Sequence, residues 1–369
     1  MASHLVVRAT KVIAHYYLRS LSRRLSKPLV KPWWVIVDIT DRCFLRCPTC
    51  AKWLGPPVRE ELSTEEWRGI VDCLAGWLGR FHLSFTGGEP LLRQDLPELI
   101  SWARRNGATT NVMTNGHLVD KALAVRLAEA GLDSVTVSLN GMTAKTHDIS
   151  RDFPGSLDRA VEAVRTLRDA GRMKVSVSAI LMEDNAEELV SLVDWVRSEG
   201  LDGVGIQPLV PAYAFQSHDL PGAQSQELLS PLSNRSSPVE NGTADSSIGR
   251  LIKMKAEGYP ITSAFGLLEA TRARLQLRDG QAAPNCIAGF DNVLIDPYGE
   301  VRICNLLPPL GNARESHPRA LWHSPLAEEQ RRIARRCTKP CQLLACNFED
   351  SPPTRARQFI GRLRIRKKA

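Results

Sequence analysis

Apolar and polar positions alternate in two repeating patterns between residue 33 and about residue 210. Short apolar runs predict buried strands, and longer stretches with an apolar residue every three or four positions predict amphipathic helices. Ser63 and Glu66 make a capping box at the start of the first helix, and Gly107 and Gly131 end the next two. The predicted strands are 33–39, 81–85, 109–113, 134–139, 174–181 and 203–207, and the helices between them are about 63–78, 96–106, 119–130, 157–170 and 186–198. This alternation predicts a parallel α/β barrel or a doubly wound sheet, with the chemistry at the carboxyl ends of the strands.

The regular pattern ends at Pro208. Residues 216–247 are rich in Ser, Pro, Gly and Asn, which predicts a long loop or a disordered insert. A helix is expected at about 248–257 and a hairpin at about 293–303. We therefore expect five segments, namely a leader at 1–32, a barrel at 33–210, a linker or insert at 211–283, a cysteine-rich α+β extension at 284–350 and a tail at 351–369.

The composition is that of an ordinary globular protein, with 43% hydrophobic and 24% charged residues. No apolar run reaches the roughly 18–20 residues that a membrane-spanning helix needs. The N-terminus lacks the continuous apolar core of a signal peptide. Nine cysteines without an export signal indicate a reducing compartment, where metal or redox roles are expected before disulfides. We therefore expect a cytoplasmic protein.

The net charge of +8 is concentrated at the two ends of the chain. Residues 1–32 hold seven Lys and Arg side chains and no acidic one, and residues 355–369 hold seven more, again without an acid. The rest of the chain is therefore net negative. It shows no basic patch with interleaved aromatic residues, so nucleic-acid binding is not expected.

The basic leader also carries an apolar stripe. Ile13, Tyr17, Leu21 and Leu25 follow one another at intervals of four, which predicts an amphipathic helix with a basic face. We expect this helix to pack onto the barrel, and contact with a membrane surface or an anionic substrate is the alternative. The basic tail is expected to be a solvated, disordered end.

Three cysteines lie close together directly after the first predicted strand. Cys43, Cys47 and Cys50 are spaced by four and three residues, so one loop can present all three thiolates to one metal or cluster. Four ligands would close a structural zinc site, whereas three leave one position open for a substrate. No obvious fourth ligand lies nearby in the sequence. An iron–sulfur cluster with one free iron therefore fits better than zinc or a set of cysteines without a metal.

The motif from Cys43 to Cys50, Cys-Phe-Leu-Arg-Cys-Pro-Thr-Cys, resembles the signature of the radical S-adenosylmethionine (SAM) superfamily. The second strand ends in Thr86-Gly-Gly-Glu-Pro90, which resembles the GGEP element of that family, and the likeness extends over residues 33–210. It implies a partial (β/α)6 barrel of the TIM type that binds a 4Fe–4S cluster and S-adenosyl-L-methionine.

The GGEP element has an expected role in binding that cofactor. Gly87 and Gly88 allow the backbone to approach the ligand closely. Glu89 offers a carboxylate to the amino group of the methionyl moiety. A lone Gly-Gly-Glu-Pro would more often be a turn, but its place after the cysteine motif favours the cofactor role.

Further cofactor positions follow from the same resemblance. These positions are Thr49, Pro90, Asn115, Ser138, Asn140, Arg151 and Ser178. Asn115 resembles a position that lines the cofactor site, and Ser138 and Asn140 resemble the ribose-contacting end of the fourth strand, where the family more often has Asp in place of Asn140. Arg151 resembles an arginine that reaches the cofactor carboxylate or the substrate. Thr49 stands where the family commonly has an aromatic residue that contacts adenine through its backbone. Helix capping and turn formation are the alternatives for these positions.

Five of the remaining cysteines follow residue 285. They are Cys286, Cys304, Cys337, Cys341 and Cys346. The first two flank the predicted hairpin, and the segment between them resembles the opening of the twitch and SPASM extensions, which hold auxiliary 4Fe–4S clusters. The spacing implies one auxiliary cluster of the twitch type, with zinc as the alternative. Five candidates for four positions leave one cysteine, among the last three, as a possible hydrogen donor.

The resemblance implies reductive cleavage of SAM to a 5′-deoxyadenosyl radical, which abstracts a hydrogen atom from the substrate. We expect a small polar metabolite, such as a sugar or aminocyclitol, that undergoes epimerisation or dehydrogenation, because the 32 residues before the first strand are too few for a peptide-recognition domain. A peptide-modifying maturase is the first alternative, and an iron–sulfur electron-transfer or scaffold protein is the second. An external reductant such as flavodoxin or ferredoxin is the expected partner.

Overall fold

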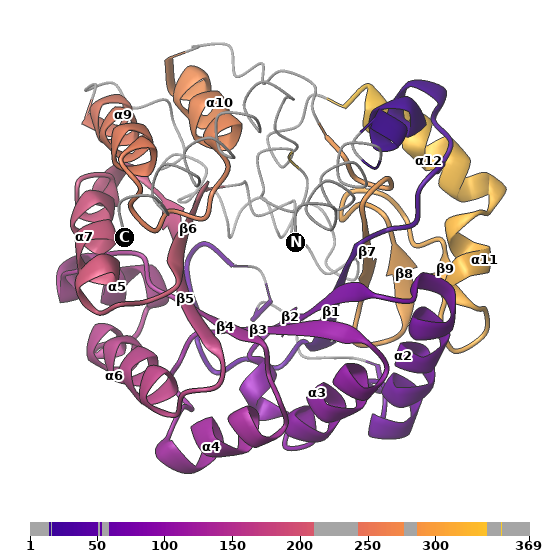
Figure 1. Ribbon diagram of the computed structural model, residues 1–369, viewed down its shortest axis with the longest axis horizontal. Coiled ribbons are helices and arrows are strands. Elements are labelled where there is room, and N and C mark those ends of the chain that lie inside the picture. Colours follow the sequence, from indigo (N-terminus) through magenta and orange to yellow (C-terminus); the bar gives the residue numbers. More distant parts are fainter. Residues whose placement is uncertain are drawn as a thin grey trace, which may run out of the picture.

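The computed structural model describes residues 15, 17–50, 52–53, 59–209, 243–276, 286–337 and 348. Six parallel strands form a curved wall with helices on its outer side (Figure 1). The strands are β1 (Trp34–Thr40), β2 (Phe81–Gly87), β3 (Ala108–Thr114), β4 (Ser134–Ser138), β5 (Lys174–Leu181) and β6 (Gly203–Pro208). The outer helices are α2 (Thr64–Leu78), α3 (Leu96–Arg105), α4 (Lys121–Glu129), α6 (Ser156–Asp169) and α7 (Glu188–Ser198). The partial barrel expected from the sequence is thus confirmed.

The two faces of this wall differ in polarity. On β4 and β5, Val135, Val137 and Val177 are fully buried against the outer helices. The opposite face carries half-buried hydroxyl side chains, among them Ser138 and its register partner Ser178. The hydrophobic core therefore lies between the sheet and the helices, and the inner face of the wall at these strands is polar, unlike the packed interior of a closed TIM barrel.

The C-terminal extension continues the same sheet. Strand β7 (Asn292–Ile295) pairs in parallel with β1, and β8 (Glu300–Arg302) and β9 (Gly311–Asn312) follow in antiparallel order, giving nine strands in the order β6-β5-β4-β3-β2-β1-β7-β8-β9. Helices α11 (Pro318–Trp322) and α12 (Pro325–Arg335) cover it, and Trp322 packs on Trp77 of α2 with ring centroids 6.1 Å apart. The hairpin was expected, but its pairing with β1 was not.

Several elements differ from the sequence expectation. Helix α5 (Ala144–Arg151) was missed because only His147 and Ser150 of its residues are buried, so it has no apolar period. Helix α9 (Thr243–Ala256) begins earlier than expected, and α10 (Phe265–Gln276) was not predicted. Two short 3-10 helices, η1 (Pro90–Leu92) and η2 (Glu183–Asn185), follow β2 and β5. Residues 216–242 of the expected loop lie outside the described residues. Residues 243–247 belong to α9 and not to a loop.

The leader helix is present over residues 17–25, but its orientation reverses the expectation. It contacts the C-terminal extension through the ion pair of Arg19 with Asp291 at 2.6 Å. Tyr17, Leu21 and Leu25, which were expected to pack onto the barrel, are exposed. Polar contacts therefore fix this helix to the molecule.

Candidate functional site

The three cysteines after β1 lie in one loop at the carboxyl end of the strand. The loop is folded by a hydrogen bond from the Cys50 amide to the Cys47 carbonyl at 3.0 Å, and the Trp53 indole donates to the same carbonyl at 3.0 Å. The pKa of Cys43 is raised to about 11, mainly by burial, with smaller contributions from the charges of Glu89, Cys47 and Cys50. The influence of Cys47 and Cys50 on the pKa of Cys43 indicates that the three thiols lie near one another.

This donor set fits an iron–sulfur cluster better than a single ion. No three Cys, His, Asp or Glu side chains in the described part of the chain converge closely enough to hold one metal ion. A cluster needs no such convergence, because each thiolate binds a different iron. Binding to iron would also relieve the burial cost and the mutual repulsion of these thiolates.

The glycines of the Gly87–Pro90 turn are required by the cysteine loop. A Cβ on Gly87 would lie 2.3 Å from the carbonyl oxygen of Thr40, and one on Gly88 would lie 2.2 Å from that of Arg42. The Gly88 amide donates to the Thr40 carbonyl at 2.7 Å, and the Glu89 amide donates to the Arg42 carbonyl at 2.8 Å. The sequence explained these glycines by approach to a ligand. The structure adds that they let β2 dock onto the backbone that enters the cysteine loop.

The carboxylate of Glu89 joins the ends of β2 and β3. It is 1% exposed, and its Oε1 accepts from the Thr114 hydroxyl at 2.7 Å and from the Leu91 amide at 3.1 Å. Its Oε2 accepts from the Asn115 amide at 2.8 Å. Burial raises the pKa of Glu89, and these three hydrogen bonds oppose that shift. Pro90 starts η1, which places the Leu91 amide against the carboxylate.

The other resemblance-based positions lie at neighbouring strand ends. The side-chain oxygen of Asn115 accepts from the His117 amide at 2.9 Å, which closes the turn after β3. Asn140 is 1% exposed, and its side chain donates to Ser150 at 3.1 Å and accepts from the Ile180 amide at 3.0 Å. Asn140 therefore ties α5 and β5 to the end of β4 in this structure. Thr49 is half-buried in the cysteine loop.

Arg151 comes to the cysteine loop from 104 residues away in the sequence. Its guanidinium nitrogen lies 3.9 Å from Cys47 Sγ. Among the described residues, its Nε and the Nδ1 of His117 are buried polar atoms without a hydrogen-bond partner. A buried donor with no partner is costly, so this corner of the site is suited to an anionic group of a ligand.

A pair of histidines behind Arg151 was missed by sequence reasoning. His147 is fully buried, and its Nδ1 accepts from the Asn140 amide at 3.0 Å. Ser156 Oγ lies 2.7 Å from His117 Nε2 and 3.4 Å from His147 Nε2, so the hydroxyl bridges the two rings. Burial, with the charge of Arg151 and the His117 ring, lowers the pKa of His147 to about 3. The only sequence signal was the polar stretch that folds into α5.

A lysine two residues after Cys50 was also missed. Lys52 Nζ lies 2.8 Å from Asp38 and 2.5 Å from Asp41. Burial alone would lower the pKa of Lys52, but the two carboxylates together raise it. Asp41 also interacts with the Tyr298 hydroxyl, in the turn between β7 and β8. Lys52 and Tyr298 thus connect the cysteine loop to the C-terminal extension.

The late cysteines form a second group in the extension. The pKa of Cys286 is raised to about 12, mainly by burial, with smaller contributions from the nearby Cys304 and Cys337. The structure therefore brings together three of the five candidate ligands. The other two, Cys341 and Cys346, lie outside the described residues.

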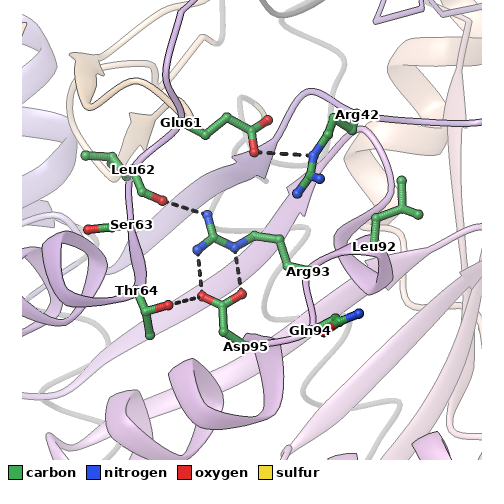
Figure 2. A pocket seen from close by; sticks show the side chains of 9 residues that line it. All are labelled: Arg42, Glu61, Leu62, Ser63, Thr64, Leu92, Arg93, Gln94 and Asp95. Carbon is green, nitrogen blue, oxygen red and sulfur yellow. Dashed lines mark hydrogen bonds and ion pairs between the residues drawn. The ribbon is translucent and has the colours of Figure 1, made fainter.

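The side chains that line a pocket near the end of β1 hold the backbone there in place (Figure 2). Arg93 crosses it, pairs with Asp95 at 2.6 Å, and donates to the carbonyls of Ile39 at 3.1 Å and Leu62 at 2.8 Å. The charged groups drawn in Figure 2 pair with one another, as Arg42 also does with Glu61 at 3.6 Å. These side chains therefore position the backbone that precedes the cysteine loop.

Family comparisons agree with this geometry. Residues 37–196 match the Radical SAM superfamily, and residues 286–347 match the SPASM iron–sulfur cluster-binding domain. Two relatives match about half of this chain. These are Fe-coproporphyrin III synthase of Methanosarcina barkeri, 35% identical over 48% of this chain and 44% of the relative, and PqqA peptide cyclase of Granulibacter bethesdensis, 32% identical over 46% and 45%. The chain thus spans less than half the length of these two proteins.

Two further matches cover most of the chain. AdoMet-dependent heme synthase of Oleidesulfovibrio alaskensis is 27% identical over 77% of this chain and 73% of the relative. The crystal structure of Streptococcus suis SuiB bound to precursor peptide SuiA has a TM-score of 0.62 and 16% identity, and the match covers 90% of this chain and 78% of SuiB. The second match shows a shared fold.

The contact of Gly88 with the cysteine loop can be tested with alanine. Gly88→Ala should displace the Arg42 carbonyl and disturb the cysteine loop, so that the protein retains clearly less iron after anaerobic reconstitution. Gly69→Ala in α2 is the matched control, because a Cβ there meets nothing within 4 Å. Equal iron contents for the two variants would show that the close approach at Gly88 is unimportant.

The buried His147 predicts a pH dependence of stability. Its pKa is about 3 in the folded chain and returns towards 6.5 on unfolding, so below pH 6.5 the unfolded chain binds a proton that the folded chain excludes. The free energy of unfolding should therefore fall by on the order of 3 kcal/mol as the pH drops from 6.5 to 4. Thermal unfolding of the apo-protein should show a smaller fall for His147→Gln than for wild type, and an unchanged fall for the exposed His317→Gln. Parallel curves for all three proteins would contradict this.

Proposed function

Because this chain belongs to the radical SAM superfamily and carries a SPASM iron–sulfur domain, we propose that it is an enzyme that modifies a peptide. When bound to Cys43, Cys47 and Cys50, a 4Fe–4S cluster supplies the electron that cleaves SAM to methionine and a 5′-deoxyadenosyl radical, which takes a hydrogen atom from the substrate. The SPASM domain implies auxiliary iron–sulfur binding. Among the described residues, we propose Cys286, Cys304 and Cys337 as its ligands, since the pKa of Cys286 responds to the other two.

The residues around the cysteine loop have distinct proposed roles toward SAM. Glu89 Oε2 accepts a hydrogen bond from the Asn115 amide, and its second lone pair would accept from the methionyl ammonium group. Arg151 holds the methionyl carboxylate with the guanidinium that also faces Cys47. Ser138 and Ser178, adjacent on the inner faces of β4 and β5, bind the ribose. These contacts would hold SAM in a fixed position relative to the substrate. They would also keep water away from the reacting atoms.

The similarity to PqqA peptide cyclase carries the choice of a peptide. The match is 32% identical and extends over 46% of this chain. The inner face of β4 to β6 is compatible with a large substrate, since the inward positions at Ser176, Ser178 and Gly205 bear small side chains. These observations favour a peptide over the sugar or aminocyclitol that the short leader suggested.

A tetrapyrrole substrate is the second candidate. The observation that favours it is the similarity to AdoMet-dependent heme synthase, which extends over 77% of this chain. The two candidates differ in the product, because a cyclised peptide loses hydrogen and a decarboxylated porphyrin loses carbon dioxide.

The proposed chemistry predicts cofactor cleavage by the reconstituted protein. With dithionite and SAM under anaerobic conditions, wild type should release 5′-deoxyadenosine and Cys47→Ala should release none. Cys73→Ala is the matched control, because Cys73 lies in α2 outside the cysteine loop, and it should behave as wild type. If wild type and Cys47→Ala release equal amounts, the protein is no radical SAM enzyme and an electron-transfer role is favoured.

The substrate class is tested by mass change and isotope transfer. The reconstituted enzyme is given SAM, reductant and, in separate reactions, the short peptides encoded beside its gene or Fe-coproporphyrin III. We expect a peptide to lose hydrogen, and a peptide deuterated at the reacting carbon should transfer deuterium to 5′-deoxyadenosine. Loss of carbon dioxide from the porphyrin, with the peptides unchanged, would replace the peptide proposal with the second candidate.

A further inference from the structure

The helix over residues 17–25 presents its polar side to the protein and its apolar side to solvent. Arg19 and Ser22 of this helix, and Ser26 directly after it, are at most 5% exposed although all three are polar. The large apolar side chains are the exposed ones. Their exposed fractions are 62% for Tyr17, 44% for Leu18, 43% for Leu21 and 53% for Leu25. At about 100° per residue these four lie within about 100° of one another, as a continuous stripe.

Polar contacts hold the helix in this orientation. Arg19 and Asp291 form an ion pair at 2.6 Å with both side chains largely buried, and His15 lies 3.7 Å from the same carboxylate. Arg335 of α12 donates to the Arg24 carbonyl at 2.5 Å, and Figure 1 shows the indigo helix beside α12. Breaking a buried ion pair costs several kcal/mol. The helix therefore cannot roll its leucines inward without losing that pair.

The exposed apolar surface continues along the chain after the helix. Leu29 is 45% exposed and Trp33 is 49% exposed, just before β1. Tyr and Trp flanking leucines are typical of segments that lie in the interface of a bilayer. Exposed apolar surface of this extent is costly in water, so it indicates a binding partner.

The charge around the stripe identifies that partner. Arg24 and Lys27 are exposed beside it, and the first 32 residues contain no acidic side chain. The ammonium group of Lys31 donates to the Trp77 carbonyl at 2.6 Å instead. An identical face on a second copy would bring these cations against one another, whereas an anionic lipid surface would neutralise them. No helix of the described chain is long and apolar enough to cross a membrane.

We propose that the stripe of Tyr17, Leu18, Leu21 and Leu25, with Leu29 and Trp33, seats the enzyme on the surface of a bilayer that contains anionic lipids. The leucines and aromatic rings enter the interface between headgroups and acyl chains, and the flanking cations bind the headgroups. The buried Arg19–Asp291 pair keeps this face outward in the unbound protein. This seat does not depend on which substrate the barrel takes.

Cosedimentation of the reconstituted full chain with vesicles tests the proposal. Wild type should bind vesicles of phosphatidylglycerol and phosphatidylcholine, bind pure phosphatidylcholine weakly, and dissociate as salt rises. Leu21→Glu/Leu25→Glu should lower the partition coefficient at least tenfold. In the double variant Arg24→Gln/Lys27→Gln, each of the two changes should lower the partition coefficient on anionic vesicles about fivefold. Ile333→Glu is the matched control, because Ile333 is 50% exposed on α12 outside the stripe, and it should bind as wild type.

Two further measurements separate the outcomes. Release of 5′-deoxyadenosine without vesicles should be equal in wild type and Leu21→Glu/Leu25→Glu, which shows that the variant is folded. The proposal is overturned if wild type fails to bind anionic vesicles, or if the double variant binds them as well as wild type does. It is also overturned if gel filtration shows a dimer that the double variant disrupts while neither protein binds vesicles, since the face then serves a second copy.

Discussion

The buried carboxylate of Glu89 holds the site together. A carboxylate at 1% exposure is costly unless donors surround it, and here the donors come from η1 and from the end of β3. The amide of the same residue, with that of Gly88, bonds to the backbone entering the cysteine loop. One residue thus fixes β2, β3 and the loop of Cys43, Cys47 and Cys50 relative to one another. A cofactor bound there meets a surface that is already organised.

Charge distribution around the cysteine loop prepares it for a cluster. Burial raises the pKa of Cys43, Cys50 and Cys286, so these thiols hold their protons until a metal replaces them. Arg151 and Lys52 bring positive charge beside the loop. Lys52 is in turn connected through Asp41 to the extension, which also pairs with β1 through β7. The strands next to the two cysteine groups therefore belong to one continuous sheet.

Two surfaces of this protein reverse the usual distribution of polarity. The inner face of β4 and β5 is lined by hydroxyl side chains where a closed barrel would be packed with aliphatic ones, which suits a polar ligand space. The leader helix exposes its leucines and buries Arg19, which suits an apolar environment outside the protein. In both places a local departure from the burial rule coincides with a proposed binding surface.

The sequence by itself determined the strand–helix order, the cysteine loop, the GGEP turn and the hairpin, because each is specified by periodicity or by residues close together in the chain. It missed α5, since a polar helix has no apolar period. It also missed the pair His117 and His147, since contacts between residues 30 positions apart leave no local pattern in the sequence. It also assigned the leader helix the wrong face, because periodicity shows that a stripe exists but not which side is buried. The tertiary structure alone decided that a buried ion pair with Asp291 turns the apolar side outward. It alone brought Arg151 to Cys47 and β7 to β1, because these contacts depend on how distant elements pack.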